Sequence, residues 1–384
     1  MPGGSSVPRA SGRQHTHTSL DTDRAVALVG EICRRIDGLP LAIELAAAMV
    51  VGLDLEDISR HLDDLFDLLP QQARRADGAQ RSLRATVEWS DALLSEDERQ
   101  LLRRMAVFAG GFDLAAINAV CASESQSAAK VAGLTGRLVE KSLLLKHEAI
   151  GQYQLLETIR QYATEQLALA GDLDTIRDRH AYCYLEIGLR ESGATMTGPE
   201  RPHLDVLHRI EDNTRVALER LLKINPEAAL GLAASLNIFW WTQGKLREGS
   251  SWLARAREAA PDAPAELRAT SLFCEAFLVG HDTDDWEAAA TLLDLGIHTI
   301  SGTDEPPLIL GMLLCLRGEC DVFNNDPTSA LALTEAGYDI AARYPSSWGQ
   351  GFCAWNVGNA RRAIGDEDGA LAMFMTCHEE PACS

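Results

Sequence analysis

An internal repeat in the second half of this 384-residue sequence decides most of what it can fold into. Four segments with a common pattern begin near residues 244, 284, 325 and 365, which are 40, 41 and 40 residues apart. Each opens with a short polar turn and continues into a helix with small residues, and a second helix such as 347–364 joins the units. Because a helix pair cannot bury its apolar face alone, such pairs must stack. The pattern predicts an α-solenoid similar to tetratricopeptide repeats over residues 172–384, with its last unit truncated.

The charge of the chain is acidic and unevenly distributed. The sequence has 56 Asp and Glu against 35 Lys and Arg, a formal net charge of −21. Residues 171–384 carry 33 acidic and 17 basic side chains, whereas residues 81–170 carry 11 and 10. An acidic surface repels a phosphate backbone. Nucleic-acid binding would therefore be confined to the near-neutral middle of the chain.

The N-terminal part divides into a polar tail and a helical segment. Residues 1–20 are rich in Gly, Ser, Pro, Arg and His and are predicted to be disordered. From Ala25 to Ile36 apolar residues recur at three- and four-residue steps, which indicates an amphipathic helix. Pro40 suits the first turn of a following helix. Residues 21–75 are therefore expected to form a helical segment that precedes a polar linker.

Residues 81–170 combine helices with the clearest strand pattern in the chain. Ser95–Glu98 reads as a capping box, which predicts a helix that begins there. Asp113 is suited to cap the next helix, and a further helix is expected over 128–141. Alternating residues on both sides of 148–151 predict a β-hairpin. Three helices followed by a hairpin indicate a winged-helix domain within a mainly α-helical protein.

The third helix of this domain carries the candidate DNA-binding residues. Lys130, Arg137 and Lys141 are basic and Glu140 is acidic, so the helix has a net charge of +2. A single domain usually needs several phosphate contacts to bind DNA at physiological salt. The preferred interpretation is therefore packing within the protein, with DNA binding through these three residues as the alternative.

Neither membrane insertion nor secretion is expected. The longest apolar run, residues 39–53, is interrupted by Glu44 and is shorter than the roughly 20 residues of a membrane-spanning helix. The N-terminus has no apolar signal region. Nine cysteines are scattered without a CxxC pair, which is typical of reduced thiols. We therefore expect a cytoplasmic protein.

No arrangement of residues indicates catalysis or a metal site. His180 and Cys183 lie three apart on one expected helix, but a four-ligand metal site needs a second pair. Asp284 and Asp285 belong to an acidic turn between repeats, where capping of the next helix is the usual role. The sequence contains no GxxxxGK motif followed by Ser or Thr, so no phosphate-binding loop is predicted.

Three tryptophans mark the start of the repeats. Trp240, Trp241 and Trp252 are expected to pack between neighbouring units. A groove on the concave face of the solenoid would use the same side chains to bind a ligand or a protein partner. Packing is the preferred interpretation, and ligand or partner binding is the alternative.

Several segments resemble bacterial STAND-type regulatory ATPases, and within that group the large LuxR-type or AfsR-like transcriptional regulators with an NB-ARC module. The resemblance extends from about residue 21 onward and depends on motifs that occur in the family's order. These are EICRRIDGLPLAIELAAA (31–48), RSLRATVEWSDALLSEDERQLLRRMAVFAGGFDLAAINAVC (81–121), LVEKSLL (138–144), YQLLETIRQYATEQL (153–167), HRIEDNTRVALERLL (208–222) and FWWTQGKLREGSSWLARA (239–256).

The resemblance implies a signalling role. In the family a P-loop domain binds ATP, helical and winged-helix domains clamp the nucleotide, repeats sense a ligand or partner, and a C-terminal helix-turn-helix often binds DNA. This sequence has no P-loop and ends about one helix into its fourth repeat. The expectation is a regulatory fragment without catalysis or cofactor, to which ATP or ADP would bind only with a separate nucleotide-binding domain. The alternatives are a DNA-binding regulator and a residual nucleotide-binding protein.

Two positions correspond to nucleotide contacts in the family. Leu39 and Pro40 lie in the GLPLA motif, where the family's proline packs against adenine, and they are the candidate adenine contacts here. Residues 155–157 replace a Met-His-Asp triplet whose histidine reaches the phosphate. Leu156 cannot donate a hydrogen bond to phosphate, and Glu157 is expected to cap the following helix instead.

Overall fold

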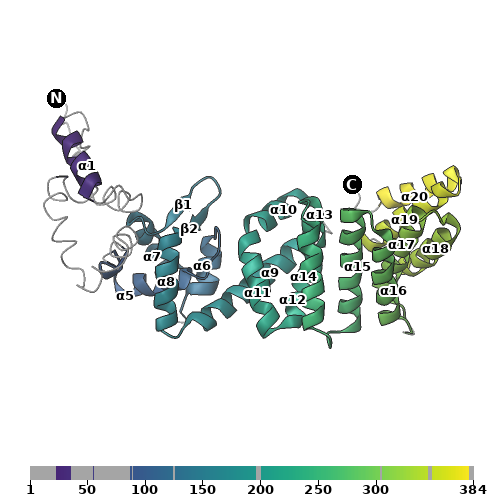
Figure 1. Cartoon of the computed structure of the whole chain (residues 1–384), viewed down its shortest axis with the longest axis horizontal. Coiled ribbons are helices and arrows are strands. Elements are labelled where there is room, and N and C mark those ends of the chain that lie inside the picture. The colour runs from purple at the N-terminus through teal and green to yellow at the C-terminus, as the bar shows by residue number, and fades with distance from the viewer. Residues whose placement is uncertain are drawn as a thin grey trace, which may run out of the picture.

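The structure, a computed structural model, describes residues 23–35, 55, 87–88, 90–123, 126–195, 200–302, 305–344 and 348–379. These residues form helices and one small two-stranded sheet, so the prediction of a mainly α-helical fold is confirmed. Figure 1 shows the winged-helix elements and the repeat helices following one another along the long axis of the molecule. None of the described helices combines the length and apolar character needed to cross a membrane.

The winged-helix domain begins with the predicted capping box. The Ser95 amide donates to the Glu98 carboxylate over 2.9 Å, and the Glu98 amide donates to the Ser95 hydroxyl over 3.4 Å. Asp113 caps the next helix by accepting from the Ala116 amide over 2.7 Å. The helices and strands are α5 (Glu96–Met105), α6 (Leu114–Cys121), α7 (Ala128–Glu140), β1 (Leu145–His147), β2 (Gln152–Gln154) and α8 (Glu157–Leu169).

The predicted β-hairpin is present and is tied to the helices by a third segment. Strands β1 and β2 pair antiparallel, with Lys146 opposite Tyr153, around a turn in which Gly151 has a φ of 64°. Phe112, between α5 and α6, exchanges two backbone hydrogen bonds with Tyr153 of 2.7 and 3.0 Å. The base of the wing is therefore fixed to the helical core.

The expected role of Glu157 is wrong. Helix α8 begins at Glu157, its N-cap is Leu156, and no side chain caps it. The Glu157 carboxylate instead accepts from Arg160 over 2.7 and 2.8 Å and from Gln161 over 2.9 Å. An acidic side chain at the first helical position interacts favourably with the helix dipole and with the following turn, but it cannot reach the amides that an N-cap residue serves.

The remaining helices comprise one N-terminal helix and the α-helical second half. The N-terminal helix is α1 (Asp23–Arg35). The second half consists of α9 (Leu173–Thr195), α10 (Glu200–Arg209), α11 (Glu211–Ile224), α12 (Pro226–Ser235), α13 (Asn237–Thr242), α14 (Leu246–Ala259), α15 (Ala265–Thr283), α16 (Trp286–Ile300), α17 (Leu308–Phe323), α18 (Pro327–Ala341), α19 (Trp348–Ala363) and α20 (Glu367–Glu379).

The repeat period is visible in the backbone of the four turns. Gly244, Asp284, Asn325 and Gly365 all have left-handed conformations, with φ of 66°, 54°, 66° and 87°. This conformation ends the first helix of each pair and is favoured by Gly, Asn and Asp. In the last three turns an aspartate follows and caps the second helix, as Asp285 does by accepting from the Ala288 amide over 2.9 Å.

The repeat helices form two layers. Helices α12 and α13, α15, α17 and α19 contact one another in sequence, and α14, α16, α18 and α20 pack against them from the other side. Small residues permit the closest approach between α17 and α18. A Cβ atom on Gly311 would lie 2.7 Å from the Gly337 carbonyl oxygen, and one on Gly337 would lie 2.5 Å from the Gly311 carbonyl oxygen.

A buried amide joins the winged-helix domain to the repeats. Asn213 of α11 is fully buried, and its Oδ1 accepts from the Ala109 amide over 2.9 Å and from His180 Nε2 over 3.0 Å. Its Nδ2 donates to the Gly111 carbonyl over 3.0 Å. The ring of Phe108 packs against His180 with centroids 5.4 Å apart. The loop after α5, helix α9 and helix α11 are therefore held by one satisfied polar side chain.

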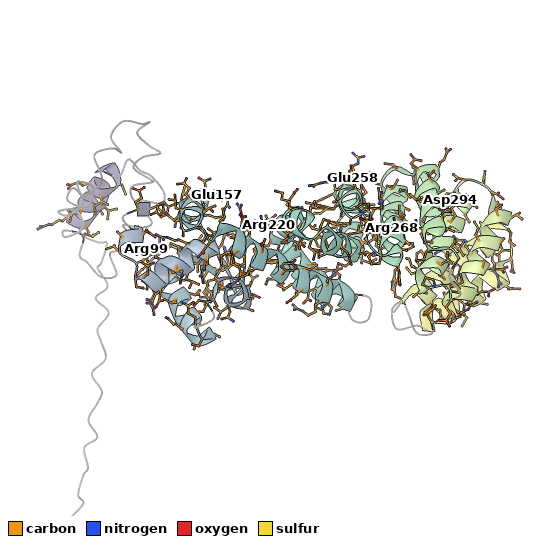
Figure 2. All side chains as sticks on the ribbon, turned by 90° about the horizontal axis from the view of Figure 1, so that it is seen from below. Arg99, Glu157, Arg220, Glu258, Arg268 and Asp294 are labelled. Atoms are coloured by element: carbon orange, nitrogen blue, oxygen red, sulfur yellow. The ribbon has the colours of Figure 1, made fainter. Side chains whose placement is uncertain are left out.

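An ion pair supports the same helices from outside. Arg220 of α11 donates to Asp178 over 2.6 Å and to Asp174 over 2.9 Å, both on α9. Figure 2 shows Arg220 in the part of the molecule between the winged helix and the repeats. Since these groups are partly exposed, they contribute less to stability than the buried Asn213 contacts.

Candidate functional site

Helix α7 is the third helix of the winged-helix domain and the first candidate site. Ser127 caps it by accepting from the Lys130 amide over 3.3 Å. Its apolar face is buried in the domain core through Val131, Leu134 and Leu138, which are each 0% exposed. Its exposed face carries Ala129, Gly133, Gly136 and Glu140 together with the half-exposed side chains of Lys130 and Arg137.

The three basic residues of α7 are all in ion pairs with α5. Lys130 Nζ lies 2.9 Å from the Asp97 carboxylate. Arg137 Nε and Lys141 Nζ lie 2.7 and 2.9 Å from the two carboxylate oxygens of Glu98. A phosphate group would therefore have to compete with carboxylates that already hold these cations.

Glu98 is the centre of this ion-pair network. Its side chain is 4% exposed and accepts from Lys141, Arg137 and the Ser95 amide. Burial alone would raise the pKa of Glu98, but the hydrogen bonds from Lys141, the Ser95 amide and Arg137 outweigh it and lower the pKa to about 2. The carboxylate is therefore ionised at any physiological pH.

The second candidate site is a groove on the inner layer of the repeats, which we call the concave groove. It has a volume of about 540 Å³, within the range of small-molecule sites. Six helices line it, namely α9, α12, α13, α15, α17 and α19. Its apolar walls include Leu189 of α9, Ile238 of α13, Phe273 of α15, Met312 of α17 and Trp348 of α19.

Three hydrogen-bond donors of the groove wall are engaged by helix carbonyls. The Ser235 hydroxyl donates to the Leu232 carbonyl over 2.8 Å, and the Thr270 hydroxyl donates to the Glu266 carbonyl over 2.8 Å. Cys274 Sγ lies 3.5 Å from the Ala234 carbonyl, and burial raises the pKa of its thiol to about 12, so it stays protonated. These three groups offer little donor capacity to a ligand.

An acceptor in the wall has no partner. Asn237 is 6% exposed, and its Oδ1 is buried without a hydrogen bond among the described residues. Glu266 is the one charged side chain among the described residues that line the groove, and it lies at the exposed first turn of α15. A buried polar atom without a partner is costly, so native proteins that keep one usually keep it for a reason. The groove is therefore mainly apolar and contains one buried acceptor without a described partner.

The three predicted tryptophans lie outside this groove. Trp240 and Trp252 are 3% and 7% exposed and pack in the core between helices. Trp241 is 44% exposed and contacts the rings of Phe277 and His281 edge-on, with centroids 5.6 and 6.3 Å apart. Sequence reasoning missed Trp348, although Trp348 and Phe352 are spaced by one turn on the inner helix predicted over 347–364.

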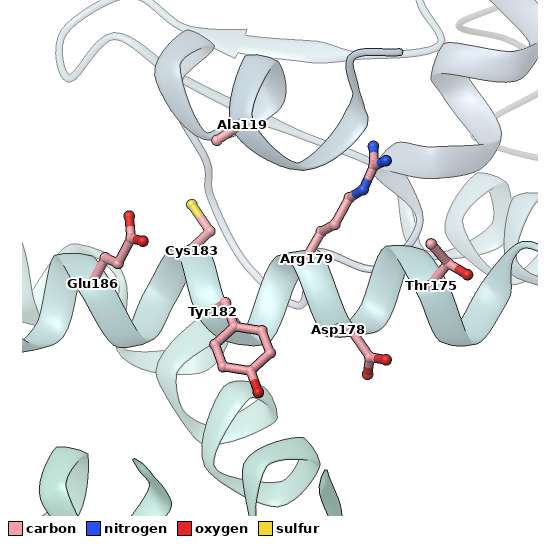
Figure 3. Close-up of a pocket in the computed structure, with 7 residues that line it drawn as sticks. All are labelled: Ala119, Thr175, Asp178, Arg179, Tyr182, Cys183 and Glu186. Atoms are coloured by element: carbon pink, nitrogen blue, oxygen red, sulfur yellow. The ribbon is translucent and has the colours of Figure 1, made fainter. Parts of the chain in front are cut away.

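The third candidate site is a cleft of about 450 Å³ between α6 and α9 (Figure 3). Figure 3 shows Arg179, Cys183 and Glu186 pointing from α9 toward Ala119 of α6. Arg179 donates to the Ala122 carbonyl over 3.1 Å. Burial raises the pKa of Cys183 to about 11, so this thiol is not activated as a nucleophile.

His180 and Cys183, the pair considered as metal ligands, face different sides of α9. Cys183 lines the cleft, whereas His180 is 1% exposed and bonds Asn213 in the core. Burial lowers the pKa of His180 to about 4, against a smaller opposing effect of the Asn213 hydrogen bond. Among the described residues, no three His, Cys, Asp or Glu side chains come together as metal ligands. His180 is therefore a packed core side chain.

The candidate adenine contacts, Leu39 and Pro40, lie outside the described residues. The same holds for most of the helical segment predicted over residues 21–75 and for the tail over residues 1–20. The adenine contact, the helical segment and the tail therefore remain predictions from the sequence.

Comparison with known proteins identifies one domain. A profile of the winged helix-turn-helix domain matches residues 94–168. The protein Rv0890c of Mycobacterium tuberculosis, provisionally named an HTH-type transcriptional regulator, is 42% identical over 232 residues, which is 59% of this chain and 26% of its own length. The uncharacterized protein Rv0894 of the same organism is 43% identical over 171 residues, 44% of this chain and 43% of its own. The chain thus spans less than half of either relative.

A solved structure is also similar at low level. It is a Signal Transduction ATPase with Numerous Domains (STAND) protein with a tetratricopeptide repeat sensor from Pyrococcus horikoshii. The match covers 88% of this chain and 60% of that chain at 13% identity, with a TM-score of 0.34. A score this low carries no argument about this chain.

Proposed function

We propose that this chain is the sensing and signal-transmitting part of a STAND-type transcriptional regulator of the LuxR-like group and catalyses no reaction itself. In this proposal the repeats bind a ligand in the concave groove, and the winged-helix domain transmits binding through protein contacts. The observation that carries the proposal is the groove of about 540 Å³ with a buried acceptor that no described residue satisfies. The winged helix-turn-helix match and the name of the relative Rv0890c support a role in transcriptional regulation.

The surface of α7 favours protein contact over DNA contact. Its basic side chains are held by Asp97 and Glu98, and small residues lie beside them on the exposed face. Gly136 would accept a Cβ atom without any contact within 4 Å, so this face is open. Small residues let another backbone approach closely, which suits packing against a nucleotide-binding domain. ATP or ADP would then be bound by that domain, with the adenine contact at Leu39 and Pro40 as part of the proposal.

The Asn213 junction gives a route between the two sites. Asn213 lies on α11, bonds His180 of α9, and holds the loop of Ala109 and Gly111 in the winged-helix domain. Helix α9 also contributes Leu189 to the groove. A ligand that shifts α9 therefore acts on the winged-helix domain through one satisfied polar contact set.

Two measurements test the proposal. Fluorescence anisotropy with labelled 30-base-pair duplexes at about 150 mM salt should show no specific binding. Specific binding that is lost on Lys130→Ala would favour the DNA-binding alternative instead.

The second measurement uses Nile red, a neutral apolar dye, as a probe of the groove. Gly231 lines the groove, and a Cβ atom there meets nothing within 4 Å, so Gly231→Leu should place its side chain in the groove. We expect dye fluorescence to rise with the wild-type chain and to be lost with Gly231→Leu. The matched control is Gly136→Leu on α7, which also has open space and should leave dye binding unchanged. Equal binding by Gly231→Leu would place the ligand site elsewhere.

A further inference from the structure

The polar groups of the concave groove differ in what they can offer a ligand. Ser235, Thr270 and Cys274 direct their donors to helix carbonyls. The groove wall also holds the Asn237 Oδ1 and the Glu266 carboxylate, and both of these oxygen groups accept hydrogen bonds. A ligand that carries acceptors alone would leave Asn237 unsatisfied, whereas a ligand with a donor would satisfy it.

The charge around the groove points in the same direction. Glu266 is the one charged group among its described lining residues, and no ion pair to Glu266 occurs among the described residues. Residues 171–384 carry 33 acidic and 17 basic side chains. The field in the groove therefore favours a cation and disfavours an anion.

A second carboxyl lies on the same helix as Met312. Glu319 follows Met312 by seven residues on α17, which is two helical turns, so both lie on one face of the helix. No hydrogen bond or ion pair of the Glu319 carboxyl occurs among the described residues, and burial raises its pKa to about 7. A cation bound nearby would favour its ionised form.

We infer that the concave groove binds a small organic cation, with an apolar body between Phe273, Met312 and Trp348 and a primary ammonium group that donates to Asn237 Oδ1 and pairs with Glu266. This inference rests on the proposed ligand-binding function and names the ligand class. The apolar walls account for most of the binding, and the ammonium group sets the selectivity.

A matched series of probes tests the inference at pH 7. The compounds 4-phenylbutylamine, 4-phenylbutanol and 4-phenylbutyrate share one apolar body and differ in the head group. Ligand-observed NMR titration of the full chain should give an affinity order of amine, alcohol and carboxylate, with the amine about tenfold or more tighter than the carboxylate. Equal affinities, or a preference for the carboxylate, would overturn the inference.

Variants separate the two acceptors. Asn237→Leu removes the buried acceptor at similar size and should weaken the amine by about tenfold while changing the carboxylate little. Glu266→Gln should weaken the amine by about threefold, since its carboxylate is exposed. The control is Glu287→Gln, an exposed carboxylate in the first turn of α16, which should change nothing. Amine binding that is unchanged in both Asn237→Leu and Glu266→Gln would also overturn the inference.

Nile red distinguishes the two possible failures. If the dye binds and Gly231→Leu abolishes its binding, the groove is a ligand site, and absence of amine selectivity refutes only the ligand class. If Gly231→Leu leaves dye binding intact, the proposed ligand site itself is wrong.

Discussion

The Glu98 network of the winged-helix domain and the Asn237 side chain of the concave groove differ in whether a buried acceptor is satisfied. In the winged-helix domain the buried Glu98 carboxylate accepts from Lys141, Arg137 and the Ser95 amide. In the groove the buried Asn237 Oδ1 accepts from no described residue. The first arrangement is complete and stabilises the fold, whereas the second costs stability until a donor arrives. A surface with its charges already paired is suited to rigid packing, and one with a free acceptor is suited to binding.

The largest expected change in stability comes from removing the carboxylate at the centre of the Glu98 network. Glu98→Gln removes a 4% exposed carboxylate and leaves Arg137 and Lys141 without a counter-charge. We expect a loss of about 3 kcal/mol in the free energy of unfolding, since breaking a buried ion pair from one side is strongly destabilising. Urea denaturation followed by circular dichroism measures the change.

The control for this variant is an exposed acid of the same helix. Glu96 is 81% exposed and pairs with Arg99 over 2.7 Å, so Glu96→Gln should change stability by less than about 0.5 kcal/mol. Similar losses for Glu96→Gln and Glu98→Gln would show that the winged-helix network is not the stabilising unit described here.

The contribution of His180, at the junction between the winged-helix domain and the repeats, to the free energy of unfolding should depend on pH. The pKa of His180 is lowered to about 4 in the folded chain from an ordinary value of 6.5. The unfolded chain therefore binds a proton at higher pH than the folded one, so the contribution of His180 is full above pH 6.5 and is lost as the pH falls toward 4. The total loss is about 3 kcal/mol, because each pKa unit corresponds to about 1.4 kcal/mol.

Comparison with His180→Gln isolates this contribution. Glu319 acts in the opposite direction, because its pKa is raised to about 7 and its penalty disappears as the pH falls. The wild-type chain and His180→Gln both keep Glu319, so its effect cancels when their free energies of unfolding are compared. The advantage of the wild-type chain over His180→Gln should therefore shrink as the pH falls from 6.5 to 4. A pH-independent difference would mean that His180 protonates in the folded chain.

The local structure of both regions was predictable from the sequence. The Ser95–Glu98 capping box, the Asp113 cap and the hairpin around 148–151 are each encoded within a few residues, and all three predictions are confirmed. The repeat spacing was also readable, because each turn needs a residue that adopts the left-handed conformation. Glu157 was misjudged because its own position relative to the helix start, a matter of one residue, decides whether it caps the helix.

The sites themselves were not predictable by the same means. Glu98 meets Arg137 and Lys141 across 39 and 43 residues, and no local pattern relates them. The groove combines Leu189 with Trp348, which only the stacking of the repeats brings to one surface. The tryptophans predicted from the sequence as possible binding residues lie at the start of the repeats. Packing buries two of them, Trp240 and Trp252. Contacts between distant segments depend on the relative orientation of helices, which periodicity alone does not specify.

Removing the free acceptor should stabilise the groove. Asn237→Leu replaces an amide whose Oδ1 is buried without a described partner by an apolar group of similar size. We expect a gain of about 1 kcal/mol in the free energy of unfolding, while amine binding is weakened by about tenfold. The control is Asn225→Leu, which removes an N-cap that accepts from the Ala228 amide over 3.1 Å and should cost about 1 kcal/mol. A loss of stability in Asn237→Leu would mean that Asn237 is a structural residue and would remove the contrast with Glu98.

The smallest expected effect concerns the glycine in the groove floor. Gly231 lies inside α12 and a Cβ atom there meets nothing within 4 Å, so Gly231→Ala should raise the free energy of unfolding by about 0.8 kcal/mol through helix propensity alone. Gly337→Ala provides the opposite case, because its Cβ would lie 2.5 Å from the Gly311 carbonyl oxygen and should destabilise the chain. Thermal unfolding of both variants measures the two changes. A glycine kept where alanine would be more stable preserves space in the groove, and a loss of stability in Gly231→Ala would show instead that the space is occupied by the protein itself.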